Sequence, residues 1–310
     1  MQATFSYLKE QLRDYYPESE IKSFYYLMME SVCHLDKQSV LLGKDTQISP
    51  DEKRFIEKMI EELKKFRPIQ YILGETEFYG LKFKVDEQVL IPRPETEELV
   101  ELVLSFARHC EDEVRSNPVK NNNLDCFTPF AMTGNHTFKT VSSRVLDIGT
   151  GSGCIAVALA KFLPGAEVYA MDISERALEI ASENARNNKV SVQFIRHDIF
   201  EDWPENLPEQ WDIIVSNPPY VTQGERDNMS KNVLDYEPHQ ALFVSEEKPL
   251  LFYERIADIA LKHLKENGQL CFETSAIHGK KVAEMLKGKG FCDVRLFSDM
   301  AGQDRILIAH

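Results

Sequence analysis

The chain has 310 residues, and 50 acidic against 36 basic side chains give a formal net charge of −14. At roughly 100–200 residues per domain, this length predicts about two domains. Hydrophobic residues make up 43% and charged residues 28%, a balance typical of a folded globular protein rather than a disordered or fibrous one. The negative charge repels a phosphate backbone, which argues against direct binding of nucleic acid.

The N-terminal sequence MQATFSYLKEQLRDYY carries charges every few positions and lacks the uninterrupted apolar segment of a signal peptide. No window approaches the ~20 consecutive apolar residues that cross a bilayer. The six cysteines are scattered and form no C-x-x-C pair, so we expect no metal site and no redox dithiol. These features predict a cytoplasmic protein without membrane attachment.

Residues 1–75 are predicted to form a small helical domain that recognises a substrate. Its clearest helix begins at Ser49, which can cap the helix, with Pro50 in the first turn and Glu52 three residues after the cap. Apolar side chains then recur at helical spacing, namely Phe55, Met59, Ile60 and Leu63.

A β-hairpin connector is predicted over residues 76–92, because apolar and polar side chains alternate around Gly80. An amphipathic helix follows, with its apolar side chains at Leu99, Val100, Val103 and Phe106. Residues 110–143 show little periodicity, and we predict a loop insertion there.

Residues 93–310 are predicted to form one α/β domain, because strand-like and helix-like segments alternate from Arg144 onward. The expected strands cover 144–148, 167–172, 192–197, 211–216, 268–274, 291–297 and 304–309, and the expected helices cover 152–163, 174–187, 248–266 and 278–289. This pattern indicates a mostly parallel seven-stranded sheet with helices on both faces. The turn before the last strand is too short for a parallel crossover, so that strand is expected to be antiparallel.

Three glycines lie between the first of these strands and the helix after it, in the run Gly149-Thr150-Gly151-Ser152-Gly153. Glycine permits a sharp turn and the close approach of a ligand. The spacing is G-x-G-x-G, and Cys154 stands where the dinucleotide fingerprint G-x-G-x-x-G would continue. The spacing favours S-adenosylmethionine over a dinucleotide pyrophosphate. A tight turn that binds nothing is the alternative.

Acidic residues end the next two predicted strands. Asp172 can accept hydrogen bonds from both hydroxyls of a ribose, and Asp198 can accept from an adenine amino group while Ile199 packs on the ring. Each aspartate could instead cap a following helix. Their occurrence at successive strand ends favours a bound nucleoside.

A buried-strand pattern at 211–216 runs directly into Asn217-Pro218-Pro219-Tyr220. Because neither proline has an N–H and residues before proline are extended, the Pro218 carbonyl is expected to lie outside the sheet's hydrogen-bond ladder. This turn should face the same crevice as the glycine run, beyond the carboxyl ends of the strands.

The Asn217 side-chain oxygen and the Pro218 carbonyl together offer two acceptors to the two N–H groups of a planar amide or amine. Holding both N–H groups orients the nitrogen for in-line attack on a methyl-sulfonium, and no strong base is required. Tyr220 could close over the flat substrate group or could be an aromatic side chain packed in the turn. We predict Asn217, Pro218 and Tyr220 as catalytic, with Pro219 also contacting substrate.

With these motifs the chain resembles the amino methyltransferases that carry Asn-Pro-Pro-Tyr, and specifically the protein-(glutamine-N5) methyltransferases acting on peptide chain release factors. The resemblance covers about residues 65–310. Further matching runs are Arg67–Gly74, Phe78–Gly80, Ile91–Glu97, Tyr236–Pro238 with Ala241 and Leu242, and Ala301–Arg305. The family often has an aromatic residue at the position of Ile199, and often Glu-Ile/Leu-Gly and a Gln where this chain has Glu273-Thr274 and His278.

The resemblance implies a Rossmann-like class I methyltransferase fold with a helical N-terminal domain. It implies transfer of a methyl group from S-adenosylmethionine to the amide nitrogen of the glutamine in the Gly-Gly-Gln motif of class-1 release factors, with S-adenosylhomocysteine as product. Expected cofactor-binding residues are Asp147, Gly149, Thr150, Gly151, Ser152, Gly153, Asp172, Asp198, Ile199 and Asn217. Arg93 and Glu97 could contact cofactor or substrate, and Arg93 could equally form a surface ion pair.

Other functions share parts of this pattern. A glutamine methyltransferase for a ribosomal protein would have the same core but tends to lack the Arg-Pro-Glu-Thr-Glu run at 93–97. A DNA adenine or rRNA guanine methyltransferase needs a basic surface and usually an added recognition domain. A non-catalytic module binding NAD or another nucleotide would use the glycine turn alone.

Overall fold

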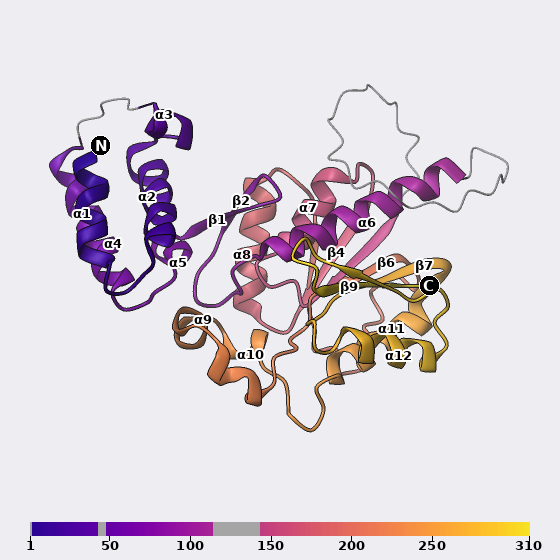
Figure 1. Cartoon of the computed structure of the whole chain (residues 1–310). Helices are drawn as coiled ribbons and strands as arrows, with labels where there is room; N and C mark the ends of the chain where they lie inside the picture. The colour runs from indigo at the N-terminus through magenta and orange to yellow at the C-terminus, as the bar shows by residue number, and fades with distance from the viewer. Residues whose placement is uncertain (1, 43–47, 114–142) are drawn as a thin grey trace. The chain divides into compact units, whose positions relative to one another are not determined.

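The computed structural model describes residues 2–42, 48–113 and 143–310. These residues pack into two compact units, one largely helical and one built on a sheet (Figure 1). The helical unit comprises Met1–Thr76, Lys84–Ile91 and Gly224–Leu242, and the sheet unit comprises Glu77–Phe83, Pro92–Gln223 and Phe243–His310. The division therefore differs from the boundaries predicted at 75 and 92, because two later segments pack with the N-terminal helices. No described helix is long and apolar enough to cross a membrane.

The helices before residue 74 build the apolar core of the helical unit. The helices of the whole unit are α1 (Gln2–Leu12), α2 (Glu18–Cys33), α3 (Lys37–Leu41), α4 (Pro50–Leu63), α5 (Ile69–Leu73), α9 (Lys231–Tyr236) and α10 (His239–Leu242), with a 3₁₀ turn at Gln223–Asn228. The predicted start of α4 is confirmed, since Ser49 and Glu52 form a reciprocal capping box. The core position predicted for Phe55 is wrong, because Phe55 is 47% exposed. The neighbouring Ile56 is buried in the core instead.

The segment after residue 223 is held to the helical unit by contacts at the end of α4. The Tyr236 hydroxyl donates to the Lys65 carbonyl at 3.0 Å. The Lys231 ammonium lies 5.1 Å from the centroid of the Phe66 ring, within cation–π range. These contacts join parts of the chain that sequence periodicity alone treats as separate.

Strands β1 (Glu75–Phe78) and β2 (Leu81–Lys84) form a hairpin. It begins one residue before the predicted connector and ends eight residues before that connector's end at 92, because the residues after Lys84 leave the ladder. Its turn residues Tyr79 and Gly80 have φ of 51° and 70°. Positive φ at both central positions matches the twist of a two-residue hairpin, which explains the glycine at the second position.

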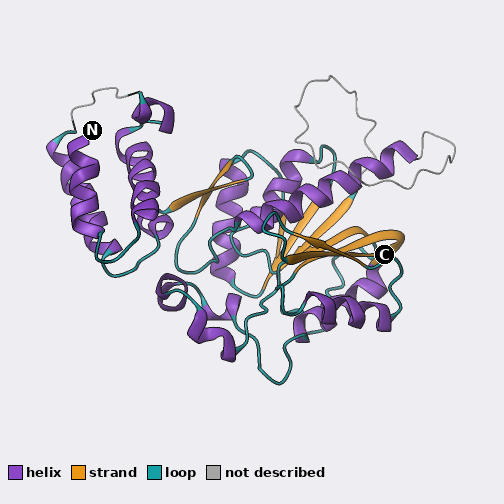
Figure 2. Cartoon of the chain, viewed as in Figure 1, coloured by secondary structure: helices purple, strands orange, loops and turns teal. Residues whose placement is uncertain are grey.

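The described residues of the sheet unit contain a seven-stranded sheet of order β5-β4-β3-β6-β7-β9-β8. Figure 2 shows its strands in orange, with purple helices around them. Its strands are β3 (Arg144–Ile148), β4 (Glu167–Asp172), β5 (Gln193–Arg196), β6 (Trp211–Ser216), β7 (Leu264–Glu273), β8 (Arg295–Ser298) and β9 (Asp304–Ala309). Strands β3 to β7 pair in parallel, and β9 is antiparallel to both β7 and β8. The predicted fold class and the antiparallel last strand are confirmed.

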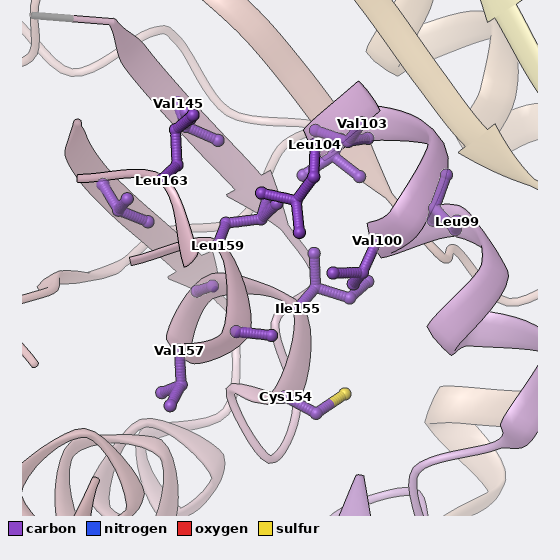
Figure 3. Close-up of a cluster of buried hydrophobic side chains, with 14 of the residues drawn as sticks. Leu99, Val100, Val103, Leu104, Val145, Cys154, Ile155, Val157, Leu159 and Leu163 are labelled. Carbon is purple, nitrogen blue, oxygen red and sulfur yellow. The ribbon is translucent and has the colours of Figure 1, made fainter. Parts of the chain in front are cut away.

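Helices cover both faces of this sheet. One apolar cluster holds side chains of α6 (Pro94–Glu113), α7 (Cys154–Phe162) and α8 (Glu175–Asn187), and a second holds those of α11 (Leu251–His263) and α12 (Gly279–Lys289). Figure 3 shows Leu104 of α6 and Leu159 of α7 in the first cluster. Alternate residues of β3 enter the two clusters, so the strand is buried from both sides.

Helix α6 includes the predicted apolar stripe and continues to Glu113. The loop insertion predicted over 110–143 therefore starts too early, because its first residues are helical. The remainder of that prediction, residues 114–142, lies outside the described residues.

Candidate active site

The parallel register brings the predicted site residues to one edge of the sheet. Ile148 of β3 pairs with Met171 of β4 and with Ser216 of β6, and Ser216 pairs with Phe272 of β7. The residues that follow these positions are Gly149, Asp172, Asn217 and Glu273. The glycine run, the first acidic residue and the Asn-Pro-Pro-Tyr turn therefore begin side by side at the carboxyl ends of neighbouring strands.

The glycine run forms a turn with an open side. Gly149, Gly151 and Gly153 have φ of 75°, 54° and 81°. A Cβ added at Gly149 or Gly151 would meet nothing within 4 Å, whereas one at Gly153 would lie 2.9 Å from the Ala181 Cβ on α8. The first two glycines thus border free space, and the third permits close packing of the turn against a helix.

Asp147 fixes the shape of this turn from beneath. Its buried carboxylate accepts a hydrogen bond from the Thr150 hydroxyl at 2.6 Å. Burial raises the pKa of Asp147 to about 7, and the Thr150 hydrogen bond opposes that rise. Thr150 and Ser152 are buried as well. Direct cofactor contact by these three side chains stays a prediction.

Asp172 links the end of β4 to the glycine turn. One of its oxygens accepts from the Gly151 N–H and the other from the Ser174 N–H, each at 2.9 Å. Burial raises the pKa of Asp172, and these backbone hydrogen bonds oppose the rise. The helix-cap alternative is wrong here, because Ser174 caps α8. Each carboxylate oxygen keeps further lone pairs that a ribose hydroxyl could use.

Asp198 lies two residues beyond the end of β5 and accepts a hydrogen bond from the Phe200 N–H at 2.9 Å. Ile199 packs partly against the cluster of α11 and α12, and its carbonyl accepts from the Arg255 guanidinium. Phe200 is exposed and contacts Phe252, with ring centroids 5.4 Å apart. An exposed aromatic ring thus stands one residue after the position at which the family often has one.

Just after the end of β6, one side-chain oxygen and one backbone carbonyl have no hydrogen-bond donor among the described residues. The Ser216 hydroxyl donates to the Ile148 carbonyl at 2.7 Å, which ties this strand end to β3. The ladder stops at Ser216. Within the described part of the chain, neither the Asn217 side-chain oxygen nor the Pro218 carbonyl accepts a hydrogen bond. The expectation that the Pro218 carbonyl lies outside the ladder is confirmed.

Thr96 and Glu273 lie behind Asn217. The Thr96 hydroxyl donates to the Glu273 carboxylate at 2.6 Å, and the Asn217 Nδ2 donates to the Thr96 oxygen at 3.4 Å. Asn217 also hydrogen-bonds the Glu273 carboxylate. Burial raises the pKa of Glu273 to about 7, opposed by these hydrogen bonds and by the charge of Arg305. The sequence patterns predicted a role for neither residue, although Thr96 lies in the matching run Ile91–Glu97 and Glu273 lies where the chain departs from the family.

The Tyr220 ring packs partly against the α11 and α12 cluster, and Pro218, two residues earlier, is buried. Burial raises the pKa of Tyr220 to about 12, the nearby Glu273 carboxylate adds to the rise, and Arg305 and Arg93 oppose it. The phenol therefore stays protonated at neutral pH. Arg93 thus lies among the charges around this turn. Glu97 instead accepts a hydrogen bond from the Tyr79 backbone N–H at 2.8 Å.

The residues at this edge of the sheet leave space and a hydrogen-bond acceptor suited to S-adenosylmethionine. The free space beside Gly149 and Gly151 is the space that a side chain would fill, so a flat ligand can approach the backbone there. The carboxylate of Asp172 stands next to that space through its bond to Gly151. Among the described residues no group of His, Cys, Asp and Glu has the arrangement of a metal site.

Comparisons with known proteins identify the family to which the chain belongs. A model of the methyltransferase small domain matches residues 131–240, and a model of the PrmC N-terminal domain matches residues 4–74. The chain is 41% identical to a release factor glutamine methyltransferase of Flavobacterium psychrophilum, over 96% of this chain and 94% of the relative. It is 41% identical to one of Bacteroides thetaiotaomicron over 98% of both, and 38% identical to one of Streptococcus pneumoniae over 98% and 96%. The chain therefore belongs to the release factor glutamine methyltransferase family.

Proposed function

We propose that this chain methylates the side-chain amide nitrogen, N5, of the glutamine in the Gly-Gly-Gln motif of class-1 peptide chain release factors, with S-adenosylmethionine as donor. The curated relatives are named for this class of substrate, and the chain matches them over nearly its whole length. The choice of one glutamine and of its amide nitrogen is supported by the chemistry of the site.

One observation carries the proposal. The free acceptors of Asn217 and Pro218 follow directly on Ser216, whose partner in the neighbouring strand, Ile148, leads directly into Gly149. Two hydrogen-bond acceptors and an open glycine turn thus start at adjacent strand ends. A primary carboxamide has two N–H donors that match two acceptors, whereas a hydroxyl or a secondary amide has one.

The residues then act by binding and orientation. Asp172 holds the glycine turn and offers lone pairs to a ribose, and the Asn217 and Pro218 oxygens hold the two N–H groups of the substrate amide. When bound, S-adenosylmethionine supplies a methyl group on a positively charged sulfur. Accepting both N–H bonds fixes the amide plane and withdraws positive charge from the nitrogen as it attacks. Orientation of this kind can be worth about 7–11 kcal/mol.

None of these steps needs a strong general base. Tyr220 keeps its proton at neutral pH, with a pKa of about 12, and Glu273 is hydrogen-bonded to Thr96 and Asn217. The nitrogen gains the methyl group and a positive charge as the carbon–sulfur bond breaks and the sulfur becomes neutral. One of the nitrogen's own two protons can then leave to water, because an N-alkylated amide cation is strongly acidic. Tyr220 is proposed to close over the flat amide, and Pro219 to contact the peptide beside it.

The proposed partners and location of the protein follow from its net charge and from the class of its substrate. The helical unit is proposed to recognise the release factor, since the relatives' N-terminal domain matches there. Direct binding of nucleic acid is not expected at a net charge of −14. We propose a cytoplasmic location, where release factors act.

The test is methyl transfer to defined candidates. The purified chain is incubated with labelled S-adenosylmethionine and, separately, a class-1 release factor, a ribosomal protein and DNA, followed by peptide mass mapping. One methyl group on the Gly-Gly-Gln glutamine is expected. Labelling of the ribosomal protein or of DNA, with the release factor unmodified, would overturn the substrate assignment. A release factor with Gly-Gly-Asn in place of Gly-Gly-Gln is the matched control and is expected to stay unlabelled.

A further inference from the structure

The side-chain amide of Asn217 has two possible orientations that differ by exchange of its oxygen and nitrogen. Only one of them leaves the oxygen available to accept from a substrate N–H. The groups behind Asn217 therefore decide whether the proposed acceptor is an acceptor at all.

We infer that Thr96 and Glu273 are positioning residues that lock the Asn217 amide with Nδ2 toward them and Oδ1 left for the substrate. This inference rests on the proposed function, because it assigns the origin of one of its two acceptors. The two residues come from the first turn of α6 and the end of β7, and they are 3% and 2% exposed.

The direction of each hydrogen bond follows from the donors present. An ionised carboxylate has no proton, so in the 2.6 Å contact between Thr96 and Glu273 the hydroxyl must donate. The Thr96 oxygen then offers only lone pairs to its other neighbour. The Asn217 atom 3.4 Å from that oxygen must accordingly be the NH₂ group, and the same group bonds to the carboxylate.

The flipped orientation has no partner to stabilise it. It would place the Asn217 oxygen against the Thr96 lone pairs and the Glu273 carboxylate, and neither would offer it a proton, because the Thr96 proton is already donated to Glu273. It would also turn the NH₂ group toward the substrate's own NH₂ group. Leaving buried polar atoms unpaired is costly, so the pair selects one orientation.

Protonation of Glu273 would weaken this selection. A neutral carboxyl group has a proton of its own, which it can donate to the Asn217 oxygen in the flipped orientation. The ionisable groups facing Glu273 are Glu95 on α6, Cys154 on α7, Tyr220 after β6, Tyr253 on α11 and Arg305 on β9. Of these Arg305 favours the ionised form. With a pKa of about 7 for Glu273, the active orientation is lost as pH falls through neutrality.

The experiment compares Thr96→Val, Thr96→Ser and Glu273→Gln in the full chain with a release factor as substrate. Thr274→Val is the matched control, because Thr274 is a fully buried threonine adjacent to Glu273 whose hydroxyl contacts the Ser275 carbonyl instead of Asn217. The measurements are kcat, KM for the release factor, the dissociation constant of S-adenosylmethionine by calorimetry, and kcat between pH 5.5 and 8.5.

Thr96→Val is expected to lower kcat by about 10-fold, with cofactor affinity within 2-fold of wild type, because orientation and not cofactor binding is lost. Thr96→Ser keeps the hydroxyl and is expected to stay within about 3-fold of wild type. Glu273→Gln is expected to lower kcat by about 10-fold and to remove the fall in kcat near pH 7 that wild type and Thr274→Val share.

Wild-type kcat in both Thr96→Val and Glu273→Gln would overturn the inference, as would an unchanged pH profile in Glu273→Gln. Thr96→Ser as slow as Thr96→Val would also overturn it, because a lost hydroxyl would then explain nothing. If wild-type protein itself leaves the release factor unmodified, the proposed function fails first. Cofactor affinity near wild type shows that each variant is folded.

Discussion

The glycine turn and the Asn-Pro-Pro-Tyr turn lie at adjacent strand ends, yet they are held in different ways. The glycine turn is shaped by contacts within the first two strands of the sheet, with Asp147 bonded to Thr150 three residues away and Asp172 to Gly151 at a separation of 21 residues. The Asn217 amide is instead oriented by Thr96, which is 121 residues away in the chain, and by Glu273.

This difference shows that the position of the site and the orientation of its side chains are determined by different contacts. Local motifs place the proposed cofactor and substrate sites, because each motif directly follows a strand of the parallel sheet. The orientation of the acceptor depends on residues brought together by folding. Variants of the local contacts should therefore change cofactor binding, and variants of the distant contacts should change the rate of transfer.

Asn217→Ala is expected to have the largest effect. It removes one of the two acceptors proposed to act as the nitrogen attacks, and losing one such transition-state hydrogen bond typically costs about 100- to 1,000-fold in kcat. Calorimetry should show S-adenosylmethionine binding within a few-fold of wild type. Methylation of a release factor at near wild-type rate would contradict the role given to Asn217.

Asp172→Ala should reverse that pattern. It removes the proposed ribose acceptor and leaves the Gly151 N–H without its carboxylate, so cofactor affinity is expected to fall by about 10- to 100-fold, a loss of 1.4 kcal/mol for each factor of ten. Glu175→Ala, an exposed carboxylate on the adjoining helix, is the control. Equal affinities in the two variants would show that the ribose assignment is wrong.

Asp147→Asn tests whether the buried carboxylate under the glycine turn makes the stability of the protein depend on pH. A carboxyl group with a folded pKa of about 7 and an ordinary unfolded value near 3.8 makes the protein less stable as pH rises between those values. Wild type should therefore lose about 2 kcal/mol more unfolding free energy than Asp147→Asn between pH 5 and 8. Urea denaturation at both pH values measures this. Parallel pH dependence in the two proteins would show that Asp147 is not the source.

Gly149→Ala tests the open side of the glycine turn against Gly74→Ala. The two glycines have φ of 75° and 76°, and an added Cβ meets nothing within 4 Å at either. Both variants should lose about 1–2 kcal/mol of unfolding free energy from left-handed strain. Only Gly149→Ala should also weaken cofactor binding, because its new methyl group would occupy the proposed ligand space. Unchanged affinity in Gly149→Ala would place the ligand elsewhere.

Tyr236→Phe is expected to have the smallest effect. It removes the hydrogen bond to the Lys65 carbonyl, a contact spanning 171 residues within the helical unit, and should lower unfolding free energy by about 0.5–1.5 kcal/mol. Tyr7→Phe, an exposed tyrosine in the same unit, is the control. Identical denaturation midpoints would mean that this distant contact contributes nothing.

Sequence periodicity was sufficient for the alternating core, the order of its strands along the chain and the Ser49 cap, because each depends on residues close in sequence. It failed at Phe55, since an apolar residue on the edge of a helical stripe can face solvent. It also missed that Gly224–Leu242 packs with the N-terminal helices, which depends on contacts such as that of Tyr236 with Lys65.

The site divides in the same manner. The placement of the glycine run, Asp172 and Asn217 at neighbouring strand ends was predictable, because each ends or directly follows a buried-strand pattern. Thr96 and Glu273 were not, because a threonine in a helix and a glutamate ending a strand have many ordinary uses. Two cues were present in retrospect: a glutamate closing an otherwise apolar strand, and the Arg-Pro-Glu-Thr-Glu run whose threonine meets it.

The most direct test is a crystal structure of the protein with S-adenosylhomocysteine and a release factor bound together. The glutamine amide nitrogen is expected within about 3.2 Å of both the Asn217 Oδ1 and the Pro218 carbonyl oxygen, on the side of the cofactor sulfur. A glutamine amide that contacts neither oxygen, or that meets the Asn217 NH₂ group instead, would contradict it.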